Sequence, residues 1–299
     1  MKITITGASG FVGSNLQNYL KPYFELFPLS ARYLPKQSFE ISTEALIHLA
    51  GKAHDVKKVA RPQEYFEANY ELTKQLFDSF LGSKASVFIY MSSVKATADE
   101  VEGVLTEENS PNPKTPYGIS KFQAESYLLK QQLPEGKRVY ILRPCMIHGP
   151  GNKGNLNLLY ALVKKGFPWP LVAFENQRSF LSIENLCFVI KELLENESVP
   201  SGIYNVADAE SMATNKLIAL LSKAQNKQPK TLAVPKNTII ALARIGDFLH
   251  LPLNSERLQK LTESYVVSAS KLVNAIGKPL PVSAEDGLIK TFQSFHNAQ

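Results

Sequence analysis

The chain has 299 residues, of which 44% are hydrophobic and 20% are charged, enough to bury a large core and to form two lobes. No apolar run approaches the ~20 residues that a transmembrane helix needs, so we expect no membrane span. The net charge of +6 suits an anionic substrate, but no basic block interleaved with aromatic residues indicates a nucleic-acid partner.

The cysteines and the first residues indicate where the protein works. Cys145 and Cys187 lie in apolar stretches, so we expect small core residues rather than a disulfide. The chain enters the β-branched run Lys2–Thr6 without the basic and apolar regions of a secretory signal. We therefore expect a cytoplasmic protein.

A glycine-rich turn follows Lys2–Thr6, which is typical of a buried strand, and precedes residues at helical spacing. Strand, glycine turn and helix are the context that a dinucleotide-binding fingerprint requires, although such a turn can also merely connect two elements. Gly7 permits the tight turn, Gly10 lets backbone approach a pyrophosphate, and Gly13 lets the helix pack closely. The helix N-terminus offers N–H groups to the phosphates. The cofactor-binding residues predicted here are Gly7, Ser9, Gly10, Phe11, Val12 and Gly13.

The second predicted strand, Glu25–Leu29, bears on the choice of cofactor. An acidic residue often ends this strand in NAD-binding chains, where it accepts the ribose 2′-hydroxyl. Here the strand is followed by Ser30, Ala31 and Arg32. A guanidinium can pair with a 2′-phosphate, so we predict that Arg32 favours NADP(H), with NAD(H) as the alternative. An ordinary surface arginine is the competing interpretation.

Strands alternate with helices through the first half of the chain, which predicts a parallel sheet covered on both faces. This pattern indicates an α/β, Rossmann-type doubly wound fold. Predicted helices fall between the strands, notably at Glu64–Leu81 and Pro116–Gln132. Further strands are expected at Ala45–Leu49, Ser86–Met91, Arg138–Leu142 and Ile203–Val206.

Three residues make a candidate catalytic group. Tyr117 and Lys121 are four residues apart on a predicted helix, so their side chains share one face. An ammonium one turn away favours the phenolate and lowers the pKa of the phenol toward working pH, which suits general acid–base catalysis. Ser93 follows a strongly apolar strand, and we predict that its hydroxyl binds the reacting oxygen. The alternatives are a serine that caps the strand and a chance tyrosine–lysine spacing.

The character of the sequence changes after Pro144. A glycine- and asparagine-rich loop over 149–155 leads into a predicted helix from about Leu156 to Lys165, and the tail beyond Ser211 is largely helical. We expect residues 1–150, with 178–207 returning to them, to form the cofactor-binding domain. Residues 151–177 and 208–299 then form a smaller, mostly helical substrate lobe. Within it, Asn237–His250 is an amphipathic helix that we expect to pack into the core rather than attach to a membrane.

The chain resembles the extended short-chain dehydrogenase/reductases, the NAD-dependent epimerase/dehydratase family that acts on nucleotide sugars. The resemblance covers nearly the whole length. It is carried by the segments Thr6–Gly13, Ile47–Gly51, Met91–Lys95, Pro116–Lys121, Leu142–Pro144, Gly149–Gly151 and Arg178–Leu186.

The resemblance implies roles for individual residues. Ser93, Tyr117 and Lys121 would form the catalytic triad, with Lys121 also holding the nicotinamide ribose. Asn69 corresponds to a helix asparagine near the active centre. Further cofactor contacts are implied for Leu49, Ala50, Gly51, Asn69, Tyr117 and Pro144.

The reaction within this family is narrowed by two positions. Sugar 4,6-dehydratases of the family carry an Asp-Glu pair after the catalytic hydroxyl, whereas this chain has Val94 and Lys95, so dehydration is not expected. The segments Ser92–Lys95 and Gly151–Asn155 resemble a branch of the family that acts on N-acetylated hexosamine nucleotides. This resemblance implies a nucleotide-sugar oxidoreductase acting at C4, which reduces a UDP-4-keto-6-deoxy-N-acetylhexosamine for surface polysaccharide synthesis. The alternatives are a UDP-hexose or UDP-N-acetylhexosamine 4-epimerase and a non-catalytic protein that senses NAD(P).

Substrate and partner predictions complete the picture. Asn155 and Arg178 are the candidates for the diphosphate of a UDP-sugar, since an amide and a guanidinium both donate to phosphate oxygens; a loop cap and an ion pair are their structural alternatives. The histidines show no metal-ligand spacing, so no metal site is expected. Family members often dimerise through two helices per subunit, so a homodimer through Glu64–Leu81 and Pro116–Gln132 is expected.

Overall fold

Six parallel strands form the central sheet in the computed structural model, which describes residues 1–53, 61–152, 154–249 and 254–297. The strands lie in the order β2-β1-β3-β4-β6-β9, and each neighbouring pair runs parallel. The doubly wound sheet predicted from the sequence is confirmed. The bounds are β1 Lys2–Thr6, β2 Glu25–Leu29, β3 Ala45–His48, β4 Val87–Met91, β6 Arg138–Pro144 and β9 Gly202–Val206.

The strand order identifies where a ligand binds. Taken in chain order the six strands are arranged 2-1-3-4-5-6, whereas the common dinucleotide-binding order, 3-2-1-4-5-6, has one more strand outside β2. Residues 30–44 form no strand here and lead directly into β3. The order reverses between β1 and β3, and ligands of such sheets bind beyond the carboxyl ends of the strands at that point.

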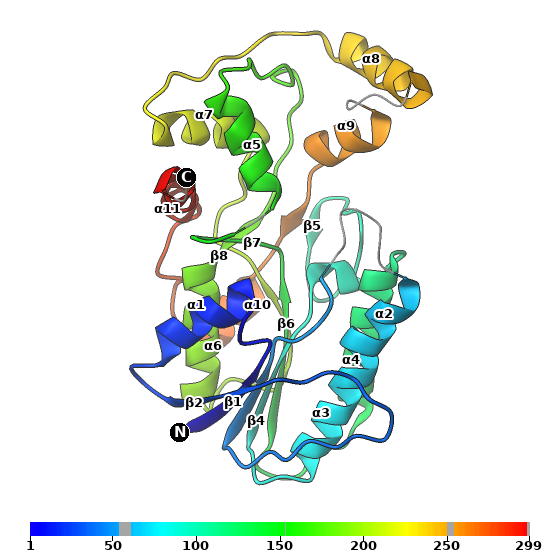
Figure 1. The fold of residues 1–299 in the computed structure, drawn as a ribbon, viewed down its shortest axis with the longest axis vertical. Coiled ribbons are helices and arrows are strands. Elements are labelled where there is room, and N and C mark those ends of the chain that lie inside the picture. Colours follow the sequence, from blue (N-terminus) through cyan, green and yellow to red (C-terminus); the bar gives the residue numbers. More distant parts are fainter. Residues whose placement is uncertain (54–60, 153, 250–253, 298–299) are drawn as a thin grey trace.

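Helices cover both faces of the sheet (Figure 1). Alternate residues of one strand face opposite sides: Val87 and Ile89 belong to the core cluster shared with α1 and α6, while Phe88 and Tyr90 belong to the cluster shared with α3 and α4. The helix bounds are α1 Phe11–Leu20, α3 Leu72–Leu81, α4 Pro116–Lys130 and α6 Ile183–Glu195.

The helix predicted over Glu64–Leu81 contains a π-helical turn that the sequence pattern did not reveal. It consists of α2 (Pro62–Phe66), the π turn Glu67–Glu71 and then α3. Thr73 Oγ1 and Tyr90 Oη donate to the carbonyl of Asn69, at 2.7 and 3.3 Å, and so satisfy a group within the widened turn. Such turns occur frequently at functional sites.

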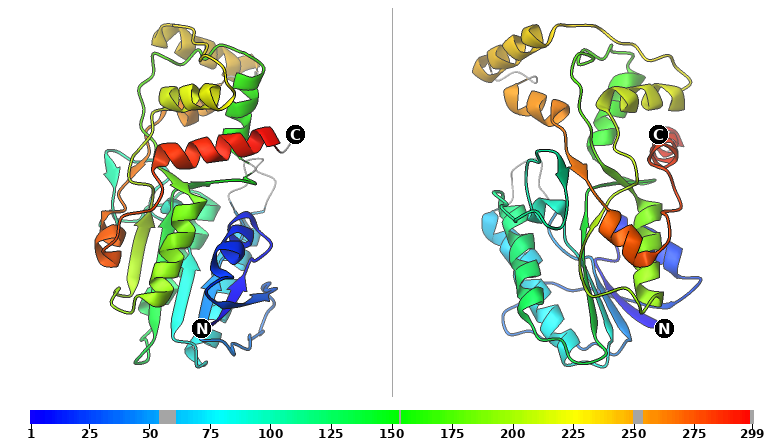
Figure 2. Two further views of the ribbon diagram at one scale, coloured as in Figure 1. Left: turned by 90° about the vertical axis from the view of Figure 1, so that its left-hand side faces the viewer. Right: turned by 180° about the vertical axis from the view of Figure 1, so that it is seen from behind.

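A second core cluster lies beyond the carboxyl edge of the sheet and forms a mostly helical lobe. Figures 1 and 2 show its helices gathered at one end of the molecule, away from the chain's N-terminus. Trp169 is buried in this cluster, and its indole N–H donates to Asn215 Oδ1 at 3.0 Å. The helices are α5 Asn155–Lys164, α7 Thr214–Ala224, α8 Lys236–Leu249, α9 Ser255–Thr262 and α11 Ala284–Asn297.

Short elements connect the lobe to the sheet. Two small parallel ladders pair β7 (Met146–His148) with β8 (Phe180–Ser182) and β5 (Val104–Leu105) with β10 (Val266–Val267). Beyond β10, α10 (Ser270–Ile276) contacts β9. Val267, Leu272 and Ile276 belong to the core cluster of the sheet, so this stretch, which we assigned to the smaller lobe, packs with the larger domain.

Candidate active site

The glycine turn after β1 forms a cradle at the switch point. Gly7 has φ +68°, and a Cβ there would lie 2.7 Å from the backbone nitrogen of Ala50. A Cβ on Gly13 would lie 2.3 Å from the carbonyl oxygen of Gly7. Helix α1 begins after Gly10 without a side-chain cap, so its first N–H groups remain for an anion. This cradle fits the pyrophosphate of a dinucleotide.

The other predicted cofactor residues lie around the same edge. Ser9, Gly10 and Gly51 are exposed, and Phe11, Val12, Leu49 and Ala50 are half-buried. Arg32 is exposed beyond the end of β2, where β2 pairs with β1. It therefore lies on the side of the cradle at which an adenosine ribose is held in such folds.

Asn69, in the π turn, supports this edge through the backbone that follows β3. Its Oδ1 accepts from the Lys52 N–H at 2.8 Å, and its Nδ2 donates to the Lys52 carbonyl at 3.1 Å and to Ser120 Oγ at 3.1 Å. A Cβ on Gly51 would lie 2.6 Å from Asn69 Oδ1 and 3.3 Å from Lys121 Nζ. In the structure Asn69 thus positions the loop of Gly51 and Lys52.

The three predicted catalytic residues converge from two elements. Ser93 follows β4, is 8% exposed and caps the short 3₁₀ turn Val94–Ala96, with Oγ accepting from the Lys95 N–H. Tyr117 lies in the first turn of α4, which Thr115 caps. Lys121 lies one turn later, and its Nζ donates to the Met91 carbonyl at 2.7 Å.

Burial determines the protonation of this group. It raises the pKa of Tyr117, while a hydrogen bond from the Ser93 side chain lowers that pKa in part. Burial also lowers the pKa of Lys121 to about 7, and the Glu125 carboxylate opposes that shift. The ammonium effect on the phenol that the sequence spacing predicted is therefore not the main influence in this structure, and the phenol stays protonated at neutral pH.

A buried ionic network behind Lys121 was missed by sequence reasoning. Glu125 lies one further turn along α4, and Arg143 lies in β6; both are essentially inaccessible to solvent. Arg143 donates to Glu125 through Nε at 2.9 Å and Nη2 at 2.5 Å, and Ser92 Oγ donates to the same carboxylate. The four-residue spacing from Lys121 to Glu125 was the available signal.

Two adjoining cavities meet at the catalytic residues. The inner cavity, of about 230 Å³, is lined by residues that include Gly51, Lys121 and Ile147. The outer cavity, of about 570 Å³, is lined by residues that include Lys95, Arg178 and Tyr265. Both are lined by Ser93, Tyr117, Pro144 and Cys145. The serine and tyrosine hydroxyls can therefore act on a group held between the cradle side and the smaller lobe.

The structure places one of the two predicted substrate residues, Arg178, in the wall of the outer cavity. Arg178 lines the outer cavity, but its Nη1 donates to the Lys260 carbonyl at 2.6 Å and its Nη2 lies 3.4 Å from Glu263 Oε1. It is therefore ion-paired while lining the cavity. Asn155 is the first residue of α5, and its side chain lies outside the described part of the structure. Lys95, in the same cavity wall, lies 4.3 Å from the Tyr265 ring centroid and donates to the Asp99 carbonyl.

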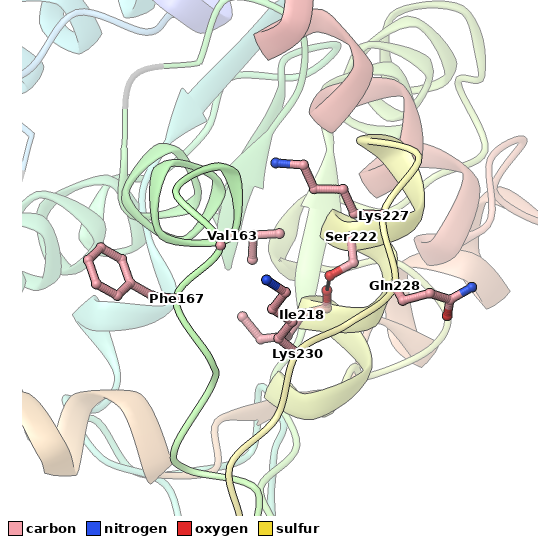
Figure 3. Close-up of a pocket in the computed structure, with 8 residues that line it drawn as sticks. Val163, Phe167, Ile218, Ser222, Lys227, Gln228 and Lys230 are labelled. Carbon is pink, nitrogen blue, oxygen red and sulfur yellow. Dashed lines mark hydrogen bonds between the residues drawn. The ribbon is translucent and has the colours of Figure 1, made fainter.

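Two other features lie outside the group of catalytic residues Ser93, Tyr117 and Lys121. A cavity of about 340 Å³ in the smaller lobe is bordered by Ile218, Ser222, Lys227 and Lys230 (Figure 3), and none of its lining residues belongs to the catalytic group.

His48 contacts Thr6 and Thr73 through its two ring nitrogens, and burial lowers its pKa to about 3. His48 is therefore a packed, neutral histidine.

Comparisons with known proteins agree with this geometry. Residues 34–207, more than half of the chain, match the NAD dependent epimerase/dehydratase family. The UDP-glucose 4-epimerase of Vibrio cholerae is 29% identical, over 99% of this chain and 96% of the relative. The GDP-6-deoxy-D-mannose reductase of Pseudomonas aeruginosa is 30% identical, over 74% of this chain and 79% of its own length.

A solved structure extends the comparison to the fold. The structure of RMD from Pseudomonas aeruginosa complexed with NADPH is similar, with a TM-score of 0.74 and 24% identity, covering 100% of this chain and 99% of that one. The relatives thus include both epimerases and reductases, and both NAD and NADPH occur among them. The chain belongs to the NAD dependent epimerase/dehydratase family and is an enzyme.

Proposed function

We propose that the protein is an NAD(P)-dependent oxidoreductase acting at C4 of a nucleotide sugar, and that it reduces a UDP-4-keto-6-deoxy-N-acetylhexosamine for surface polysaccharide synthesis. One observation carries the proposal: Ser93 and Tyr117 line both the inner and the outer cavity. The inner cavity adjoins the glycine cradle and suits the nicotinamide end of the cofactor. The outer cavity suits the sugar.

Ser93, Tyr117 and Lys121 have separate roles in the proposed carbonyl reduction. A nicotinamide cofactor held beside the glycine cradle would supply the hydride. Ser93 Oγ holds the carbonyl oxygen by a hydrogen bond, and Tyr117 donates its phenolic proton to that oxygen as negative charge develops. Because burial raises the pKa of Tyr117, the phenol carries its proton at neutral pH. Lys121 would hold the nicotinamide ribose and, when protonated, would stabilise the phenolate that remains.

Reduction is the first choice because the exposed Arg32 suits the 2′-phosphate of NADPH, and a preference for NADPH is typical of a reductase whose cofactor exchanges at every turnover. A 4-epimerase would instead begin by oxidising the hydroxyl at C4, with the Tyr117 phenolate as base. The 4-epimerase remains the second candidate because the Vibrio cholerae relative matches this chain over nearly its full length. Both candidates use the same three residues.

Further parts of the proposal concern the cofactor, the substrate phosphates and the assembly. We propose NADP(H) as the preferred cofactor, supported by the exposed Arg32 beyond β2. Arg178, in the outer cavity wall, exchanges its partner Glu263 for the substrate diphosphate, with Asn155 as a second donor. We also propose a cytoplasmic homodimer.

A cofactor and substrate panel tests the proposal. Purified protein is incubated with 4-keto and 4-hydroxy UDP-sugars and with NADPH or NADH, and both cofactor oxidation and sugar epimerisation are measured. Stoichiometric NADPH oxidation with a 4-keto sugar is expected. Interconversion of UDP-hexoses without net cofactor consumption, by protein that retains NAD through purification, would identify the epimerase instead. Cofactor binding without turnover of any substrate would leave only the sensor.

A further inference from the structure

Helix α8 carries an apolar face that is exposed in the part of the chain that the structure describes. The residues Ile239, Ala243 and Gly246 are buried and form the face that packs toward α9 and the smaller lobe. On the other side, Leu242, Ile245, Phe248 and Leu249 are exposed, with Phe248 at 84%. These residues recur at spacings of three and four, so they form one continuous face. The core packing that we expected for this helix accounts for only one of its two apolar faces.

The charged side chains of α8 itself are mostly basic. The helix contains Lys236 and Arg244 and one acidic residue, Asp247. The acidic one, Asp247, accepts hydrogen bonds from the N–H of Ser255 at 2.9 Å and from its hydroxyl at 2.5 Å, so it is turned toward α9. Lys236 and Arg244 are both exposed.

The position of α8 leaves this basic, apolar face accessible. Figures 1 and 2 show the helix at the outer end of the smaller lobe, beside α9 and far from the sheet. Leu232, in the segment that leads into α8, is also exposed. The helix has 14 residues, fewer than the ~20 needed to cross a bilayer, and no described helix is long and apolar enough to do so.

From these observations we propose that α8 binds the surface of an anionic bilayer, with its apolar face in the headgroup boundary and its basic side chains against the lipid phosphates. A short helix with one strongly apolar face and flanking basic residues is typical of such attachment. A second copy of the chain is disfavoured as the occupant. A symmetric contact sets each patch against itself and would bring the basic side chains of both copies together.

The attachment has a consequence for the outer cavity. Glu256, Gln259, Lys260 and Glu263, from α9 and the residue after it, line that cavity, and α8 packs on α9. An enzyme held through α8 therefore brings the wall of its outer cavity close to the membrane surface. This part rests on the proposed function; the binding of α8 to lipid does not.

Vesicle co-sedimentation of the full-length protein tests the proposal. Phosphatidylcholine vesicles are compared with vesicles that also contain phosphatidylglycerol. We expect binding to the anionic vesicles alone, which weakens at high salt. The double variant Ile245→Ser/Phe248→Ser should lose binding. The double variant Lys236→Gln/Arg244→Gln should weaken it about 30-fold, since each basic residue near the surface contributes about fivefold. Leu158→Ser, an equally exposed apolar change on α5, is the matched control and should bind normally.

Three outcomes would overturn the proposal: no binding to anionic vesicles, binding that Ile245→Ser/Phe248→Ser leaves unchanged, or self-association of the native protein that this variant abolishes. Thermal unfolding checks that the variants fold, which is expected because all five substituted positions are exposed. Turnover of a water-soluble substrate is measured in parallel and should be the same for every variant. A failure of the proposed function would abolish that turnover without affecting vesicle binding.

Discussion

Glu125 and Lys121 lie one turn apart on α4, and the carboxylate of Glu125 opposes the fall in the pKa of Lys121 that burial produces. The same carboxylate receives two hydrogen bonds from Arg143 and one from Ser92. The charge state of Lys121 thus depends on a network that is itself shut off from solvent. Since the pKa of Lys121 is about 7, small changes in this network alter its protonation at physiological pH.

Replacing Glu125 with Gln should therefore shift the pH dependence of the enzyme. Loss of the carboxylate lowers the pKa of Lys121 below about 7, so activity that requires the ammonium should decline at a lower pH than in the native protein. The variant also leaves Arg143 buried without its counter-ion, at a cost to folding of about 3–5 kcal/mol. The pH profile of kcat, measured where the variant remains folded, checks the first effect and urea unfolding the second.

Glu192→Gln is the matched control for that variant. Glu192 is 6% exposed and pairs with Lys278 at 2.8 Å, outside both catalytic cavities. Its substitution should leave the pH profile in place. An unshifted profile in Glu125→Gln as well would show that Glu125 does not act on Lys121.

Arg32→Asp should change the preferred cofactor. The carboxylate repels a 2′-phosphate and can accept from a 2′-hydroxyl, so the Kd for NADPH should rise by about tenfold or more while NADH binding is kept or improved. Fluorescence titration with both cofactors measures the ratio. Lys130→Asp makes the same change of charge at the exposed end of α4 and should leave the ratio as it is. If Arg32→Asp also leaves the ratio of the NADPH and NADH affinities unchanged, Arg32 does not contact the 2′-phosphate.

His48 should make the folded state sensitive to acid. Its folded-state pKa is about 3, well below the ordinary 6.5, so the unfolded chain takes up the proton first as the pH falls. The stabilisation is complete above pH 6.5 and is lost toward pH 3, at about 1.4 kcal/mol per pH unit. As the pH falls from 6.5 to 4.5, the unfolding free energy measured by urea titration should decrease in the native protein. In His48→Gln this decrease should be smaller by about 2–3 kcal/mol. Equal pH slopes would contradict this.

The outer surface of α4 should form part of a dimer interface. Leu129 is 55% exposed at the end of this helix, on the face of the sheet that α3 also covers. Sedimentation velocity is expected to show a dimer, and Leu129→Glu should shift it toward monomer because a charge is buried at the interface. Leu158→Glu, at a more exposed position on α5, serves as the control. A native monomer would refute the expectation.

Much of the fold followed from local sequence signals. The first strand, its glycine turn and the helix after it were predicted because hydrophobic periodicity and glycine position act over a few residues. Tyr117 and Lys121 were placed together for the same reason. The π turn at Asn69 was not predicted, since the residue that it buries is a polar asparagine, which gives no signal in an apolar pattern.

Long-range relationships account for the remaining differences. The pairing of Arg143 with Glu125 joins β6 to α4, and no spacing rule connects them. Likewise, Val267 and Leu272 lie in the C-terminal segment that the sequence pattern assigns to the helical lobe, yet they pack into the core of the sheet. The exposed face of α8 also could not be recognised, because an apolar stripe in a sequence does not reveal whether another element covers it.

The most direct test of the proposed mechanism is the rate at which Tyr117→Phe oxidises NADPH in the presence of a UDP-4-keto sugar. The substitution removes the phenolic proton and little else, so kcat should fall by about 10²–10⁴ while the Kd for the cofactor stays close to the native value. The control is Tyr127→Phe, on the same helix as Tyr117. It removes a hydroxyl that donates to Asp78 of α3 and should retain full activity. Native turnover by Tyr117→Phe would contradict the account.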